Sequence, residues 1–115
     1  MQTCIFCKLI NREIPPKFIY ESDTVVAFYD IHPQADIHIL VVPKKHISDF
    51  LALGELDSDL THEIIQVIQK LTKETKSDKI GYRIAISGGR YQEVPHLHWH
   101  LLGDLTTKRR PRFLT

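Results

Sequence analysis

The sequence predicts an α+β domain in which a mostly antiparallel five-stranded sheet carries one long helix and a short N-terminal helix. Two observations lead to this prediction. Apolar residues recur at helical spacing most clearly over residues 57–76, whereas shorter apolar or alternating segments end at proline, glycine or acidic turns. Three of these short segments precede the long helix and two follow it, so a meander, a helix and two further strands make up the domain.

The first part of the chain is expected to hold a short helix and three strands. The helix covers residues 4–11 and ends before Pro15 and Pro16, because the residue before a proline is disfavoured in helical conformation. Turn residues bound strands at residues 18–20, 24–29 and 38–42. A tight turn joins the first two strands, and Pro43 ends the third.

The long helix over residues 57–76 is amphipathic. Acidic residues near its start and lysines near its end match the helix dipole. Gly81 follows it, a fourth strand is expected over residues 82–86, and a loop over residues 87–93 leads to the fifth. The apolar stripe of the helix consists of Leu60, Ile64, Ile65, Val67, Ile68 and Leu71.

The fifth strand is the most informative segment, because histidine alternates there with bulky apolar residues. Alternation with period two is typical of a half-buried strand, whose same-face side chains lie about 6.6 Å apart. The strand therefore places Leu97, Trp99 and Leu101 toward a core, and His96, His98 and His100 on the other face. Three of the seven histidines on one strand face indicate chemistry rather than a solvated surface.

The bulk properties limit the class of protein. The 115 residues are enough for one domain with a single core. A net charge of +1 gives no electrostatic reason to expect a nucleic-acid or membrane partner, and we interpret the basic cluster at residues 108–112 as part of a solvated tail over about residues 105–115. No spanning or secretory segment is visible, so we expect a cytoplasmic protein.

The two cysteines form one Cys-x-x-Cys pair, Cys4 and Cys7, which indicates a zinc site. Zinc needs two further ligands, and His46 and one histidine of the triplet are available. A thioredoxin-like redox pair is disfavoured because no strand precedes it, and two reduced cysteines packed as small apolar residues form the third alternative.

Nucleophilic catalysis by histidine is the second candidate chemistry. A neutral imidazole attacks phosphorus when its far nitrogen is held by an acceptor and donors surround the phosphate oxygens. His98 fits, because it has a histidine on each side on the same face. His38 adds a further donor if the third strand lies beside the fifth.

Taken together, the motifs resemble those of the histidine triad (HIT) family, in its Hint-like branch of nucleoside phosphoramidases. The family motif is His-φ-His-φ-His-φ-φ with φ apolar, and residues 96–102 fill every place. The remaining matches follow in the family's order between residues 4 and about 103, and lie at residues 4–8, 13–15, 27–30, 33–38, 42–47 and 92–95.

The resemblance implies a HIT-like fold and a hydrolase acting on a purine nucleoside monophosphate derivative or phosphoramidate. His98 would attack the α-phosphorus and form a nucleotidyl-histidine intermediate, while His100 and His38 would bind phosphate and assist proton transfer. Asp30 would accept hydrogen bonds from the ribose hydroxyls, because a carboxylate offers only acceptors. The resemblance places Ile5, Phe6, Phe28, Ile31 and Leu40 around the base, and Ser87, Gln92 and Glu93 toward the leaving group.

The resemblance also implies a structural zinc ion and a homodimer. The zinc ligands would be Cys4, Cys7, His46 and His96, which leave no open position on the metal. The dimer would form through the long helix and the fourth strand, whose apolar edge needs covering.

The chain departs from the family at two places. The loop beginning Ser87-Gly88-Gly89 is about two residues shorter than usual, with Ser87 where an asparagine is common, and the C-terminal tail is basic and lacks tryptophan. Two alternatives to the hydrolase stay open: a zinc-stabilised nucleotide-binding or interaction module with little turnover, and a metallohydrolase whose catalytic metal is held by the histidine triplet.

Overall fold

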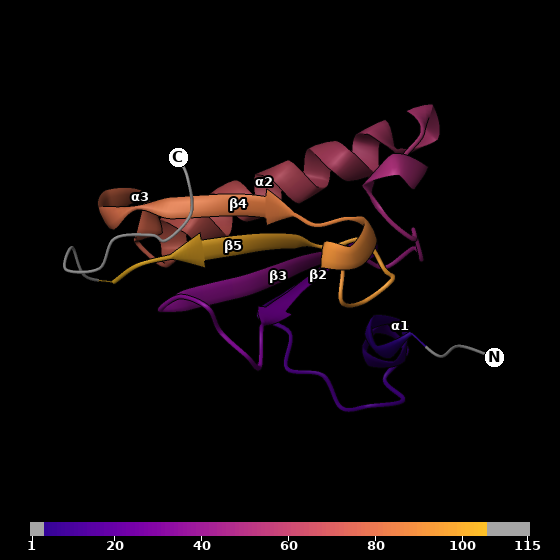
Figure 1. The fold of residues 1–115 in the computed structure, drawn as a ribbon, viewed down its shortest axis with the longest axis horizontal. Coiled ribbons are helices and arrows are strands. Elements are labelled where there is room, and N and C mark those ends of the chain that lie inside the picture. Colours follow the sequence, from indigo (N-terminus) through magenta and orange to yellow (C-terminus); the bar gives the residue numbers. More distant parts are fainter. Residues whose placement is uncertain (1–3, 106–115) are drawn as a thin grey trace.

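The structure, a computed structural model, describes residues 4–105 (Figure 1). The basic cluster at residues 108–112 lies outside the described residues. Five strands form one antiparallel sheet in the order β1-β2-β3-β5-β4, which agrees with the predicted fold class. The strands are β1 (Tyr20–Glu21), β2 (Val25–Tyr29), β3 (Ile37–Pro43), β4 (Tyr82–Ile86) and β5 (Trp99–Gly103).

The helices cover both faces of this sheet. The long helix α2 (Ser58–Glu74) lies on one face and α1 (Ile5–Ile10) on the other, as Figure 1 shows. No helix within residues 4–105 is both long and apolar enough to cross a membrane. Short helical segments connect the main elements: η1 (Phe50–Ala52), η2 (Glu55–Asp57), α3 (Ser77–Ile80) and η3 (Gly89–Tyr91).

The long helix ends earlier than the periodicity predicts. Lys76 adopts a left-handed conformation with φ of 63°, which stops α2 and starts the separate turn α3. Ile65 was expected to be buried, but 47% of its surface is exposed. On a helix Ile65 is turned about 100° from Ile64, which is buried, so it lies outside the packed stripe.

The core between α2 and the sheet contains the apolar half of the histidine segment. Leu97, Trp99 and Leu101 are buried there, as the alternation predicts. They pack with apolar residues of β2, β3 and α2, including Ala27, Ile39, Val41, Ile64, Val67, Ile68 and Leu71.

The fifth strand is shorter than expected and begins at Trp99, after two of the three histidines. The β3 ladder ends at the pair Val41–Trp99. Beyond it the backbone N–H of Leu97 donates to the carbonyl of Ile47 (2.7 Å), not to β3. His96, Leu97 and His98 therefore lie outside the sheet, because Pro43 has no N–H with which to continue the ladder.

The second face of the sheet, which α1 partly covers, holds polar side chains beside apolar ones. Register pairs Leu40 with His100 and His38 with Leu102, so β3 does lie beside β5. On β4, Arg83 pairs with Leu102 and Ala85 with His100, so these two side chains lie on the same face of the sheet. This face carries the candidate site.

Candidate functional site

A cavity of about 950 Å³ is lined by residues of α1 and of the sheet face that α1 partly covers. It brings together His38, His98 and His100. Gln92 is not among the lining residues, because its side-chain amide donates to the backbone carbonyl of Ser48 at 2.8 Å. The other residues predicted to bind the nucleotide all line the cavity: Ile5, Phe6, Phe28, Asp30, Ile31, Leu40, Ser87 and Glu93.

The hydrogen bond of His98 determines which of its nitrogens is free. Its Nδ1 lies 2.8 Å from the backbone carbonyl oxygen of His96. A carbonyl can only accept, so Nδ1 carries the proton and Nε2 carries the lone pair. The Phe6 ring packs edge-on against the same imidazole, with 5.1 Å between the ring centroids. His98 thus has the tautomer that a nucleophilic Nε2 requires.

A second chain of hydrogen bonds orders the other two histidines of the cavity. The backbone N–H of Gln34 donates to Nδ1 of His38 (3.1 Å), which leaves the proton of His38 on Nε2. That Nε2 lies 2.9 Å from Nδ1 of His100 and 3.5 Å from a carboxylate oxygen of Asp30. His100 therefore accepts through Nδ1 and keeps its own proton on Nε2, as a neutral donor.

Burial keeps both of these imidazoles uncharged. It is the main cause that lowers the pKa of His100 to about 4, and His98 and His38 lower it further against the opposing effect of Asp30. Burial also lowers the pKa of His38, with Asp30 again opposing. At pH 7 the pair consequently presents one neutral donor, Nε2–H of His100, which can bind a phosphate oxygen, while the hydrogen bond from His38 allows a proton to be relayed between the two rings.

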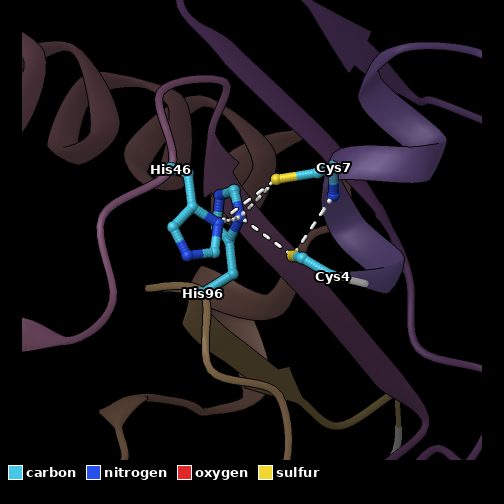
Figure 2. A group of neighbouring side chains, drawn as sticks. All are labelled: Cys4, Cys7, His46 and His96. Carbon is cyan, nitrogen blue, oxygen red and sulfur yellow. Dashed lines mark hydrogen bonds between the residues drawn. The ribbon is translucent and has the colours of Figure 1, made fainter. Parts of the chain in front are cut away.

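Next to the cavity, two cysteines and two histidines gather in a separate cluster, shown in Figure 2. Nδ1 of His96 lies 3.3 Å from Sγ of Cys4, 3.5 Å from Sγ of Cys7 and 3.1 Å from Nδ1 of His46. Nδ1 of His46 is 3.2 Å from Sγ of Cys7. The four predicted metal ligands therefore form a group that could hold a metal ion.

The residues of the cluster fit a tetrahedral metal ion. Metal–sulfur and metal–nitrogen bonds of about 2.3 and 2.0 Å would separate the ligand atoms by about 3.3–3.8 Å, close to the distances between them here. Nε2 of His96 donates to the carbonyl of Pro43 at 2.8 Å, which turns the lone pair of Nδ1 toward the sulfurs. Burial first, and then Cys4, raise the pKa of the Cys7 thiol to about 11, so metal binding would displace its proton.

The histidine triplet does not converge on one point. His96 points to the cysteines, whereas His98 and His100 line the cavity. A second group that could hold a metal among the described residues consists of Asp30, His38 and His100. A catalytic metal held by all three triplet histidines is not supported by this geometry.

Several lining residues were not identified from the sequence. Leu9 follows Ile5 at helical spacing, and Arg83 alternates with Ala85 on β4, so periodicity could have found them. Lys17 lies on an irregular segment and Tyr91 ends the three-residue η3, and neither is long enough to give a periodic signal.

Known proteins resemble this chain in both sequence and structure. The family model for the HIT domain matches residues 11–107. An uncharacterised HIT-like protein of Buchnera aphidicola is 42% identical over 101 residues, which span 86% of this chain and 90% of that protein. A HIT family hydrolase of Clostridium thermocellum superposes with a TM-score of 0.88 at 34% identity, covering 99% of each chain. A histidine triad nucleotide-binding protein of Candida albicans has a TM-score of 0.80 at 32% identity, covering 98% of this chain and 86% of that one.

Proposed function

This chain belongs to the HIT family, and on that premise we propose that it is a nucleotide-binding hydrolase with His98 as nucleophile. It would cleave the bond between the α-phosphate of a purine nucleotide and an amine or phosphate leaving group. The observation that carries the proposal is the hydrogen bond from Nδ1 of His98 to the His96 carbonyl, which leaves a lone pair on Nε2 of a ring that lines the cavity.

The reaction would take two steps. In the first, Nε2 of His98 bonds to the α-phosphorus while the bond to the leaving group breaks and a proton joins the departing atom. In the second, water attacks the nucleotidyl-histidine, the bond from phosphorus to Nε2 breaks, and a proton returns to the solution. His98 ends as it began, with its proton on Nδ1 held by the carbonyl of His96.

His100 and His38 are assigned to the phosphate. The proton on Nε2 of His100 would bind a phosphoryl oxygen, and its Nδ1 is held by His38 at 2.9 Å. Fixed neutral donors of this kind stabilise the charge that develops on phosphorus-bound oxygens in the transition state.

The remaining lining residues are assigned to the nucleoside and the leaving group. Asp30 lines the cavity and would accept from the ribose hydroxyls through lone pairs left free beside its contacts with the N–H of His32 (2.8 Å) and with Nε2 of His38 (3.5 Å). Ser87 and Glu93 would lie toward the leaving group, whereas Gln92 would need to release Ser48 to reach it. The base would lie against Ile5, Phe6, Phe28, Ile31 and Leu40. Two of the similar structures carry the descriptions hydrolase and nucleotide-binding protein, which supports this assignment.

We further propose that the Cys4–Cys7–His46–His96 cluster holds zinc. The ion would supply no chemistry to the reaction, because four protein ligands leave no open position on it. Its role would be to fix α1 to the segment that carries the triad. A cytoplasmic location is consistent with this use of the cysteines, which are not joined in a disulfide.

A homodimer through β4 and α2 is proposed from exposed apolar surface. β4 is an edge strand, and its side chains on the α2 side of the sheet are about half exposed. Ile65 of α2 is exposed as well. An apolar edge of this kind needs a partner, and a second copy would pair with it antiparallel to continue the sheet. The exposed β4 residues are Tyr82, Ile84 and Ile86.

Replacement of His98 by Ala tests the hydrolase. With an adenosine phosphoramidate, we expect turnover to fall by at least a thousandfold, while adenosine monophosphate binding and metal content persist. His62→Ala, on the exposed side of α2, is the matched control and should keep wild-type turnover. Wild-type turnover in the His98 variant would refute the nucleophile. Nucleotide binding by a wild-type protein that has no measurable turnover would instead favour the binding module.

A further inference from the structure

We propose that the Cys4–Cys7–His46–His96 cluster, when it holds a metal, positions the nucleophile and the base wall of the cavity through His96 and Phe6. Metal occupancy would then set nucleotide affinity as well as stability. The inference rests on the proposed function, because it takes His98 as the nucleophile and the cavity as the nucleotide site.

His96 is the first link, because all of its polar groups are held. Its Nδ1 lies in the cluster and its Nε2 donates to Pro43, while its backbone N–H donates to Val94 (2.8 Å). Its carbonyl oxygen is the acceptor for Nδ1 of His98. A single residue therefore connects the metal ligand set to the hydrogen bond that fixes the nucleophile's tautomer, so a shift of His96 changes that bond directly.

Phe6 is the second link and belongs to the same helical turn as the two cysteines (Figure 2 shows Cys4 and Cys7 on this turn). Only 5% of its surface is exposed. Its ring meets His98 edge-on at 5.1 Å, His96 at 5.8 Å and Phe28 at 5.5 Å. Phe6 thus contacts both the nucleophile and another aromatic residue of the cavity wall.

The helix that carries Phe6 depends on tertiary anchors. α1 has six residues, and isolated helices this short are unstable in water. Its first turn is capped by the sulfur of Cys4, which accepts from the N–H of Cys7 at 3.3 Å, a weak acceptor for such a bond. Two metal–thiolate bonds would fix this turn far more firmly than thiol hydrogen bonds do. Loss of the metal would loosen Phe6 and the wall that it forms with Ile5 and Leu9.

The experiment compares nucleotide binding and the His98 tautomer with and without zinc. In protein labelled with ¹⁵N-histidine, we expect zinc to shift His98 toward the Nδ1–H form, and calorimetry to show about tenfold tighter adenosine monophosphate binding. By reciprocity, adenosine monophosphate should tighten zinc binding by the same factor, measured against a coloured chelator.

Two phenylalanine variants separate the proposed link from general packing. Phe6→Leu should keep zinc binding but reduce the effect of zinc on nucleotide affinity to about twofold or less. Phe18→Leu is the matched control, since Phe18 lines the same cavity and packs on Phe28 (6.0 Å). It should weaken nucleotide binding equally with and without zinc, so that the tenfold effect of zinc is kept.

The outcomes are distinct. If the zinc-loaded protein does not bind adenosine monophosphate, the proposed function fails. If it binds equally well after zinc removal, with an unchanged His98 spectrum, only the present inference fails. If circular dichroism shows that zinc removal unfolds the whole chain, the inference is also overturned, because the metal would then maintain the fold rather than position His98.

Discussion

Nε2 of His38 lies 2.9 Å from Nδ1 of His100, although 61 residues separate the two in the chain. The pairing of β3 with β5 brings them together, and the N–H of Gln34 fixes the direction of the bond by donating to the far nitrogen of His38. Both imidazoles are neutral because burial disfavours their charged forms. The free energy of unfolding should therefore depend on pH through this pair.

We expect the protein to lose stability as the pH falls from about 6.5 toward 4. The pKa of His100 is about 4 in the folded protein and near 6.5 when unfolded, so between these values the unfolded chain binds a proton that the folded chain does not. His38 contributes with the same sign. His100→Asn removes one such group, and urea unfolding at pH 7.5, 6 and 5 should show a shallower decline than in wild type. Parallel declines in the two proteins would contradict the depressed pKa of His100.

Gly103→Ala should destabilise the fold. A Cβ at Gly103 would lie 2.2 Å from Oγ and 2.8 Å from Cβ of Ser77, whose side chain is fully buried and bonded to Thr75. Such overpacking costs about 1–3 kcal/mol in the free energy of unfolding. Gly88→Ala is the control, because nothing lies within 4 Å of its Cβ position and its φ of −139° suits any residue.

Both glycine variants are compared by urea unfolding. In a Ser77→Gly background, Gly103→Ala should lower the free energy of unfolding by less than it does in the wild-type protein, because the clashing atoms of Ser77 are gone. A Gly103 variant as stable as the Gly88 variant would show that α3 can move away from the sheet at no cost.

Asp30→Asn should weaken nucleotide binding through the ribose. The amide keeps an oxygen that can accept from His32 but replaces the charged acceptor assigned to the ribose hydroxyls. Hydrogen bonds to charged groups contribute about 1.5–3 kcal/mol, so adenosine monophosphate affinity should fall about 10- to 100-fold by calorimetry. The 2′,3′-dideoxy nucleotide, which lacks both hydroxyls, should bind the two proteins within about threefold. An equal loss for both nucleotides would instead assign Asp30 to the phosphate or to His38.

The sequence was a sound guide wherever a residue's environment follows from local periodicity. Alternation placed Leu97, Trp99 and Leu101 in the core, and helical spacing located α2. Alternation shows that side chains point in turn to two environments, but it does not show whether a neighbouring strand is present to pair with. The predicted fifth strand therefore began at His96, whereas β5 begins at Trp99. The left-handed Lys76 also has no local signal, because lysine rarely adopts that conformation.

In the candidate site, too, some features follow from local motifs and others depend on partners distant in the chain. The four residues of the Cys4–Cys7–His46–His96 cluster, and the residues predicted to bind the nucleotide apart from Gln92, could be named from motifs, and the structure brings each set together. Alternation alone puts His96 on one face with His98 and His100, and only the resemblance separates it from them, because its partners Pro43 and Cys4 lie far along the chain. The orientation of Gln92 depends likewise on Ser48, a residue that no local pattern connects with it.

The exposed apolar residues of β4 predict that a charge placed among them weakens the proposed dimer. Ile84 pairs with Leu101 on the α2 side of the edge strand and is 47% exposed, so Ile84→Lys should leave the monomer folded while burying an unpaired charge in the proposed dimer. Analytical ultracentrifugation should show a dimer for wild type and at least a tenfold weaker association for the variant. Leu51→Lys is the control, since Leu51 is 87% exposed and belongs to η1, which is not part of the proposed β4–α2 interface, and this variant should stay dimeric. A wild-type protein that sediments as a monomer at micromolar concentration, or equal weakening by both lysines, would remove β4 as the interface.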